Sequence, residues 1–183
     1  MSDELVLPPI VRAPRFCPYC GASLSPRELG GLARLACRDE LCGYVFWNNP
    51  TPVVAALVQW RGQMILARNA AWEEKKFGII AGFLERDESP EAGAMREVKE
   101  ELDLDCQRWS LIGAYPFPRK NEVIIAYHVE AEGEIRLSEE LCEVKLVAPD
   151  QLQGWDFGTG LAVRDWLAKR RPEGGRLGQA PRE

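Results

Sequence analysis

The stretch GFLERDESPEAGAMREVKEELDL, residues 82–104, combines a clear helix start with a crowded set of acidic side chains. Ser89 stands directly before Pro90, the arrangement expected of an N-cap and a first helical position. The apolar residues that follow recur at helical spacing, which predicts a helix over residues 90–102 with one face toward a core. Glu97, Glu100 and Glu101 gather on another sector of that helix.

These glutamates repel one another. Like charges four residues apart on a helix cost a few tenths of a kcal/mol in water, and more where water is scarce. A bound divalent cation offsets that cost, and hard cations such as Mg²⁺ prefer carboxylate oxygens while keeping positions for substrate phosphates. Two interpretations therefore arise: a solvated acidic surface helix, or a metal site for phosphoryl chemistry.

The order of residues around the helix favours the second interpretation. Gly82 is followed after five residues by Glu88, and after seven more by REVKEEL, residues 96–102. This closely resembles the Nudix box, G-x5-E-x7-R-E-U-x-E-E-x-G-U, in which U is aliphatic. The departure is Asp103, which replaces the glycine at the helix end, where a left-handed conformation is common.

The resemblance implies both a fold and an activity. The fold is an α/β (α+β) type, an α/β/α sandwich with a mixed sheet, as the order of the predicted strands and helices also suggests. The activity is hydrolysis of the pyrophosphate bond in a nucleoside diphosphate linked to another group, by attack of water on phosphorus. The catalytic cofactor implied is Mg²⁺ or Mn²⁺.

The resemblance also implies roles for the residues of the box. Glu97 and Glu101 are the metal ligands, Glu100 is a further ligand or a water bridge, and the backbone carbonyl of Ala81 joins them.

Arg96 is expected to form an ion pair with Glu88 and to hold the helix against the preceding loop. A last ligand is expected from a later segment, SEELCEVKLV, in which Glu140 is in the best position and Glu143 is next. Either glutamate could equally be a solvated loop acid. His128, the one histidine of the chain, is expected to be an ordinary strand residue and not a general base.

Four of the six cysteines form a C-x2-C pair and a C-x4-C pair separated by sixteen residues. Such grouping is typical of a metal site in a cytosolic chain. The pairs lie just before the Nudix-like segment, so the chain resembles the zinc-ribbon branch that includes the NADH pyrophosphatases. Four thiolates leave no open position, so a structural Zn²⁺ is expected on Cys17, Cys20, Cys37 and Cys42. Cys106 and Cys142 are expected to be buried as small hydrophobes.

Aromatic residues are the candidates for substrate contact. YPFP, residues 115–118, matches the second half of the S-Q-P-W-P-F-P signature of NADH pyrophosphatases, but the first half is absent. Tyr115 could stack on a flat ring or could be a core aromatic. Phe117, Phe83 and Trp47 are the other expected substrate contacts, Trp47 because relatives have a tyrosine at that place.

The chain divides into four segments by composition: a loose arm (1–15), the zinc ribbon (16–50), the Nudix domain (51–171) and a tail without apolar content (172–183). Strands are expected at 53–60, 63–68, 77–84, 108–117, 122–133 and 141–148. A short helix is expected from Pro149, and a closing amphipathic helix over 159–171.

Composition excludes some classes of protein. With 183 residues, 46% of them hydrophobic, the chain can form a core, and its net charge of −5 argues against a generally basic nucleic-acid binder. Its longest apolar run, VVAALV, is far shorter than the roughly 20 residues of a membrane helix. We therefore expect a cytoplasmic protein, and the resemblance implies that it is an enzyme acting on NADH, FAD or ADP-ribose.

Two alternatives stay open: removal of nucleotide-like caps from RNA 5′ ends, and a non-catalytic binding module. A homodimer is compatible with the sequence, which does not fix the oligomeric state.

Overall fold

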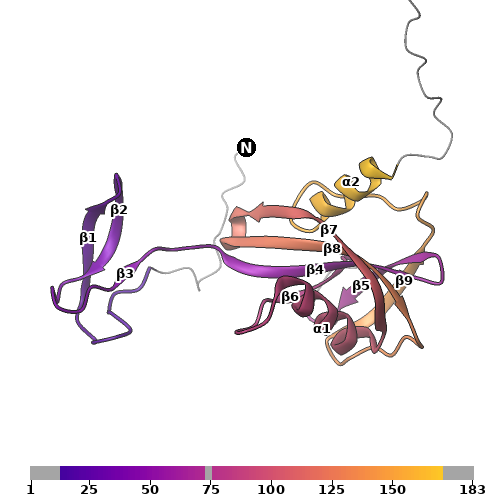
Figure 1. Cartoon of the computed structure of the whole chain (residues 1–183), viewed down its shortest axis with the longest axis horizontal. Helices are drawn as coiled ribbons and strands as arrows, with labels where there is room; N and C mark the ends of the chain where they lie inside the picture. Colours follow the sequence, from indigo (N-terminus) through magenta and orange to yellow (C-terminus); the bar gives the residue numbers. More distant parts are fainter. Residues whose placement is uncertain (1–12, 73–75, 171–183) are drawn as a thin grey trace, which may run out of the picture. The chain divides into compact units, whose positions relative to one another are not determined.

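A computed structural model of the chain describes residues 13–72 and 76–170, and they form two compact units, one ending at Pro50 and the other beginning at Thr51 (Figure 1). Most of the expected N-terminal arm, and the whole expected C-terminal tail, lie outside the described residues. Within the described ranges, no helix is long and apolar enough to cross a membrane.

The first unit is a small antiparallel sheet of three strands: β1 (Leu24–Leu29), β2 (Leu32–Cys37) and β3 (Val45–Phe46). The β1–β2 turn contains Gly30 and Gly31, both with positive φ, as a tight hairpin turn requires. The unit has little apolar core, since its large side chains Phe16, Tyr19 and Leu41 are exposed. Its stability therefore has to come from another interaction, and the four cysteines supply the candidate.

The second unit is built on a mixed six-stranded sheet in the order β7-β8-β4-β5-β9, with β6 also paired to β4. The parallel pair is β4 with β8; the remaining pairs are antiparallel. Its elements are β4 (Thr51–Trp60), β5 (Gln63–Asn69), β6 (Ile80–Phe83), α1 (Pro90–Leu102), β7 (Asp105–Phe117), η1 (Pro118–Lys120), β8 (Glu122–Glu132), β9 (Leu141–Val147) and α2 (Gly160–Lys169). The predicted fold class is confirmed.

The strand β4 carries the core on both of its faces. Alternate residues Val54, Ala56 and Val58 pack with α1, while Val53, Ala55 and Leu57 belong to the apolar cluster that includes α2 residues. On the α1 side, Val98 and Leu102 are fully buried, and burying each side chain stabilises the fold by roughly 1.5–3 kcal/mol. This packing fixes α1 against the sheet and so fixes its acidic sector.

The sheet splits along one edge of β4. The expected strands joined at Arg61–Gly62 are present, but β4 pairs with β5 only at Gln59–Met64 and Trp60–Gln63. Further along, β6 takes the place of β5 beside β4. Near the end of β5, Ala67 instead pairs with Gly78, in the segment just before β6.

The structure confirms the helix over residues 90–102, including its caps. The Ala92 N–H donates to Ser89 Oγ at 3.3 Å. Asp103 has a φ of 55° and a ψ of 29°, and its N–H donates to the Lys99 carbonyl. Aspartate therefore adopts the left-handed conformation that the glycine of the box would adopt, and the helix exit is preserved.

The segment after β9 differs from the sequence prediction. The short helix expected from Pro149 is wrong, because residues 149–151 form a single turn closed by the Gln151 N–H and the Ala148 carbonyl. Gly154, a poor helix former, follows it closely, and a Cβ there would lie 2.3 Å from the Arg164 side chain. The closing helix is formed, as α2.

We predict that Asp103→Gly raises the thermal midpoint, by roughly 2 °C. Glycine relieves the cost of the left-handed conformation, while the exposed ion pairs of Asp103 with Lys99 and Arg136 contribute little. Calorimetry checks this, with Asp103→Asn as the matched variant that loses the charge but tolerates positive φ. A glycine variant less stable than the parent chain would contradict the prediction.

Candidate active site

The acidic sector of α1 lies against β6. Glu101 is the one buried charged residue among those described, with 8% of its surface exposed. Glu97 packs directly on Gly82: a Cβ at position 82 would lie 2.0 Å from Glu97 Oε1. Glycine at this position therefore leaves room for a carboxylate against the strand backbone, which is a physical reason for the first residue of the box.

Arg96 organises this sector. Its guanidinium donates to both oxygens of Glu88, at 2.8 and 3.2 Å, so the ion pair implied by the resemblance is present. It also donates to Glu97 at 2.7 Å, to Glu100 at 2.9 Å and to the Phe83 carbonyl at 3.0 Å. One cation thus ties the helix, three of the box acids and the preceding loop together, beyond the supporting role that the sequence suggests.

The electrostatics of the acids depend on how close each lies to Arg96. Burial, together with the charges of Glu97, Glu140 and Glu100, raises the pKa of Glu101 to about 8. Burial also raises the pKa of Glu97, but its hydrogen bond to Arg96 opposes the rise. Glu101 therefore lies in excess negative charge, and a proton or a cation must compensate it.

The donor set fits a hard divalent cation. Carboxylates and a backbone carbonyl are the ligands that Mg²⁺ and Mn²⁺ prefer, and the unbalanced charge around Glu101 favours a cation. The carboxylates are not tightly clustered. Among the described residues, only the four cysteines form a group of three or more ligating side chains whose ligand atoms all lie within 4.8 Å of one another. A wider acidic site suits ions that keep part of their water shell.

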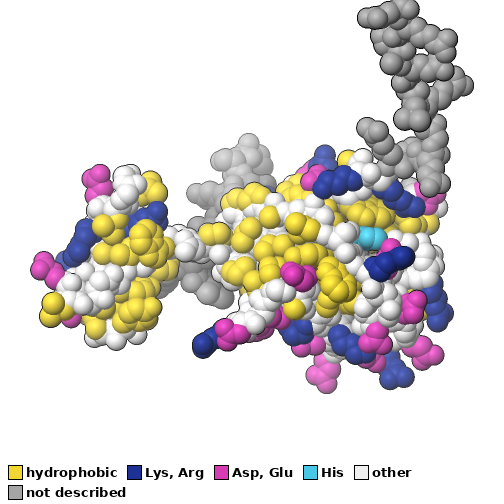
Figure 2. Space-filling model, in the orientation of Figure 1, with side chains coloured by type: hydrophobic (Ala, Val, Ile, Leu, Met, Phe, Trp, Pro, Cys, Tyr) yellow, Lys and Arg dark blue, Asp and Glu magenta, His cyan; other side chains and the backbone are white. Residues whose placement is uncertain are grey.

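Glu101 lines one part of a hollow of about 950 Å³, whose other walls include six aromatic side chains. Ala81, Phe83 and Phe117 line it too, so four residues predicted for the site share one cavity. Figure 2 shows hydrophobic side chains gathered on the second unit in the region of β4, β7 and β8. The cavity therefore combines a buried carboxylate with flat apolar surfaces.

Other predicted residues lie outside this cavity. Tyr115 is buried, its hydroxyl donates to Asp165 at 2.8 Å, and it does not line the hollow. Burial and the Asp165 carboxylate raise its pKa to about 12. This arrangement favours the interpretation of Tyr115 as a core aromatic. Trp47 belongs to the first unit, where Arg34 lies over its ring at 4.7 Å, and its contact with substrate stays a prediction.

The later glutamates differ in their surroundings. Glu143 forms an ion pair with Arg68 at 3.2 Å, whereas Glu140 acts on Glu97 and Glu101 through its charge. This difference favours Glu140 as the candidate for the last metal ligand. His128 lies on β8, half-buried, with its ring 3.1 Å from Gln59 Oε1, and burial lowers its pKa. It does not line the hollow, as expected of an ordinary strand residue.

Several lining residues were not predicted from sequence. They include aromatic and charged side chains on loops and at the ends of elements: Trp72, Lys120, Glu122, Trp155 and Phe157. Trp155 and Phe157 each stand next to a glycine, which marks a loop but does not say where the loop folds.

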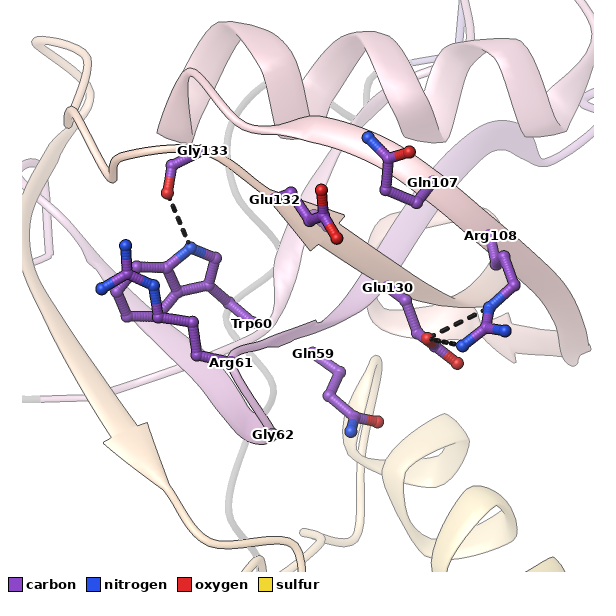
Figure 3. A pocket seen from close by; sticks show the side chains of 10 residues that line it. Gln59, Trp60, Arg61, Gly62, Gln107, Arg108, Glu130, Glu132 and Gly133 are labelled. Atoms are coloured by element: carbon purple, nitrogen blue, oxygen red, sulfur yellow. Dashed lines mark hydrogen bonds and ion pairs between the residues drawn. The ribbon is translucent and has the colours of Figure 1, made fainter.

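A second hollow, of about 770 Å³, lies at the other end of β4 and β8 (Figure 3). There Trp60 Nε1 donates to the Gly133 carbonyl at 3.0 Å, and Arg108 pairs with Glu130. No residue of the box lines this hollow. Size alone does not identify a site, and the hollow that contains Glu101 is the candidate.

The four cysteines of the first unit meet in one cluster. Cys17 and Cys42 sulfurs are 3.6 Å apart, and those of Cys20 and Cys37 are 3.5 Å apart. Four thiolates at about 2.3 Å from one Zn²⁺ are separated by about 3.8 Å, so the cluster fits this ion. Burial acts to raise the pKa of Cys17, but the backbone of Cys20 and Tyr19 lowers it to about 7, which favours the thiolate.

The two remaining cysteines differ from each other. Cys106 is half-buried, and burial raises its pKa to about 11. Cys142 is exposed, so the expectation that it is buried is wrong: it lies on β9, an edge strand of the sheet.

Comparison with known proteins agrees with this geometry. The sequence model of the NUDIX domain matches residues 49–167. The NAD-capped RNA hydrolase NudC of Mycobacterium bovis is 29% identical over 156 residues, covering 83% of this chain and 47% of the relative. NudC of Stutzerimonas stutzeri is 30% identical over 166 residues, covering 87% and 59%. The chain thus spans about half the length of these relatives.

Solved structures show the same fold. A NUDIX hydrolase from Nitrosomonas europaea superposes with a TM-score of 0.71 at 24% identity, covering 85% of this chain and 92% of that one. An ADP-ribose pyrophosphatase from Streptococcus suis gives 0.54 at 18% identity, covering 68% and 95%. Taken together, the box on α1, the mixed sheet and the match of the domain over most of the chain establish that this protein belongs to the NUDIX hydrolase family.

Proposed function

We propose that the protein hydrolyses the pyrophosphate bond of a nucleoside diphosphate linked to another group, of the NADH, FAD or ADP-ribose class, and releases a nucleoside monophosphate. The observation that carries this proposal is the cavity with buried Glu101 at one part and aromatic walls elsewhere. A diphosphate needs its charge neutralised, whereas flat rings bind to apolar surfaces. The cavity offers both a carboxylate that can hold a cation and apolar surfaces for the rings.

The residues would act in distinct ways. Mg²⁺ or Mn²⁺ held by Glu97 and Glu101, with Glu100, Glu140 and the Ala81 carbonyl as further donors, would neutralise the diphosphate and lower the pKa of a bound water.

Water attacks one phosphorus atom, the bond from that phosphorus to the bridging oxygen breaks, and two monophosphate products leave. Arg96 orients Glu97 through the 2.7 Å hydrogen bond, and Phe83 and Phe117 provide walls for the substrate rings.

A second candidate is removal of a nucleotide-like cap from RNA 5′ ends. The relatives that carry the name NAD-capped RNA hydrolase support it, and it breaks the same bond. The cavity is open to solvent, so a chain attached to the substrate is compatible with it. The intact acidic set disfavours a binding module without catalysis.

We also propose that Zn²⁺ occupies the four-cysteine cluster as a structural ion. The thiolate distances support this, and four protein ligands leave no position for a substrate.

The first prediction from the proposed function concerns catalysis. With Mg²⁺, the protein should release AMP from NADH, FAD or ADP-ribose, and Glu101→Gln should lower kcat about a hundredfold or more, because the buried donor charge is lost. Chromatography of the products across a substrate panel that includes NAD-capped RNA measures both. Glu132→Gln, on the far end of β8, is the matched control and should keep full activity.

The panel separates the candidates. Cleavage of capped RNA in strong preference to free dinucleotides would favour the RNA function. If the metal-loaded protein cleaves no compound of the panel, the proposed hydrolysis is wrong and the binding module gains support.

The second prediction concerns Gly82. In Gly82→Ala the new methyl group should displace the Glu97 carboxylate, which is the flexible end of a side chain, so stability should change little while kcat falls at least tenfold. Thermal melting and steady-state kinetics measure the two effects. Unchanged kcat in a folded variant would mean that Glu97 need not lie against β6.

The third prediction concerns the cysteine cluster. Cys17→Ser should reduce bound zinc well below one ion per chain and loosen the first unit, because a small unit without a core depends on its metal. Elemental analysis and proteolysis within residues 16–50 measure this. Cys142→Ser, at an exposed cysteine outside the cluster, is the control, and normal zinc content in Cys17→Ser would contradict the assignment.

A further inference from the structure

Glu122 is an acid in the candidate cavity that the metal-site chemistry does not use. It begins β8 and lines the hollow together with Lys120 and Phe117. Burial raises the pKa of Glu122, and the charge of Lys120 opposes that rise. No side-chain hydrogen bond to its carboxylate is found among the described residues. A half-buried acceptor with unused capacity therefore faces the cavity.

Strand register places Glu122 away from the phosphate end. Ala81 lies opposite Ala55, which lies opposite Ala126, so the β6 and β8 positions are two strand spacings apart, about 10 Å. Glu122 is four residues further along β8, about 13 Å along the strand. The metal ligands and Glu122 are thus separated by more than the length of two side chains. A carboxylate near the diphosphate would repel it, so this separation is required.

The neighbours of Glu122 suit a flat ring. Phe117 is its cross-strand partner on β7, a position at which two side chains lie side by side. The turn at Gly158 closes over this place, since a Cβ there would lie 3.8 Å from the Phe117 ring and 3.9 Å from Ile124. Phe157, next in the chain, also lines the hollow, and Arg119 lies 5.9 Å from its ring centre. A ring stacked on Phe117 would present its edge to Glu122.

Carboxylate chemistry decides what that edge must carry. An ionised carboxylate only accepts hydrogen bonds, so it favours an N–H donor and disfavours a carbonyl or carboxylate oxygen. We propose that Glu122 selects substrates whose heterocycle carries an exocyclic amino group, either the 6-amino group of adenine or the amide nitrogen of a carboxamide. This inference rests on the proposed function, since it assumes that the phosphates lie at the Glu101 end.

Two matched pairs of substrates test the proposal. ADP-ribose is compared with its hypoxanthine analogue, in which an oxo group replaces the amino group, and NAD is compared with its deamido form, in which a carboxylate replaces the carboxamide. The wild-type protein should prefer the amino member of at least one pair by about 10- to 100-fold in kcat/KM, as expected for a hydrogen bond to a charged group. The pair that responds identifies the ring at Glu122.

The variants are chosen to separate recognition from packing. Glu122→Gln keeps the shape but presents an amide that both donates and accepts, so the preference should fall to less than threefold while activity on the disfavoured member rises. Glu132→Gln, at the other end of the same strand, should keep the wild-type preference. Equal cleavage of both members of both pairs by the wild-type protein, or an unchanged preference in Glu122→Gln, would overturn the proposal.

Binding measurements distinguish this proposal from the proposed function. Calorimetry in Mg²⁺ compares AMP with IMP, and nicotinamide mononucleotide with nicotinate mononucleotide. A preference that depends on Glu122, without hydrolysis of any dinucleotide, would support the selection and refute the hydrolysis. Hydrolysis of the dinucleotides without any preference would support the hydrolysis and refute the selection. Binding of none of the four nucleotides would refute the selection.

Discussion

The concentration of carboxylates around buried Glu101 is the constraint on which the rest of the catalytic unit depends. Burial is the largest cause that raises the pKa of Glu101 to about 8, whereas a glutamate in the unfolded chain has a pKa of about 4.3. The folded protein therefore disfavours the charged form of Glu101. Without a cation, protonated Glu101 contributes stability at low pH, and this contribution is lost as the pH rises from about 4.3 to about 8. A divalent ion bound there would replace the proton as the compensating charge and would therefore also stabilise the fold.

The surrounding structure holds this unfavourable arrangement in place. Val98 and Leu102 anchor α1 in the core, so the acidic sector cannot turn toward solvent without exposing them. Arg96 compensates Glu88, Glu97 and Glu100 but makes no hydrogen bond to Glu101, so Glu101 is the acid of the box whose charge it leaves least compensated. The stability of the core and the excess charge of the site thus oppose each other, as is common where a fold carries a functional site.

Sequence predicted what is encoded locally. The box spans one loop and one helix, so its spacing fixes which acids share a sector, and the cysteine pairs likewise predict their own cluster. Tyr115 shows why the substrate-contacting residues were harder to predict from the sequence. A bulge between Leu111 and Gly113 shifts the alternation of β7, so exposed Leu111 and buried Tyr115 lie on different faces. Glu122 is placed at the cavity by its register with Thr51 of β4, which is distant in the sequence, and no local pattern encodes that register.

The two groups of metal-ligating residues differ in the chemistry that they can support. The four thiolates lie close enough to surround an ion completely, and soft sulfur ligands favour Zn²⁺ over Mg²⁺. The carboxylates are more widely spaced, and Glu101 lines an open cavity, so an ion there would keep positions for water and phosphate. Ligand type and spacing together therefore separate a structural ion from a catalytic one within a single chain. The first unit, which has few buried apolar side chains, needs the closed site, whereas the second has a core and can leave its site open.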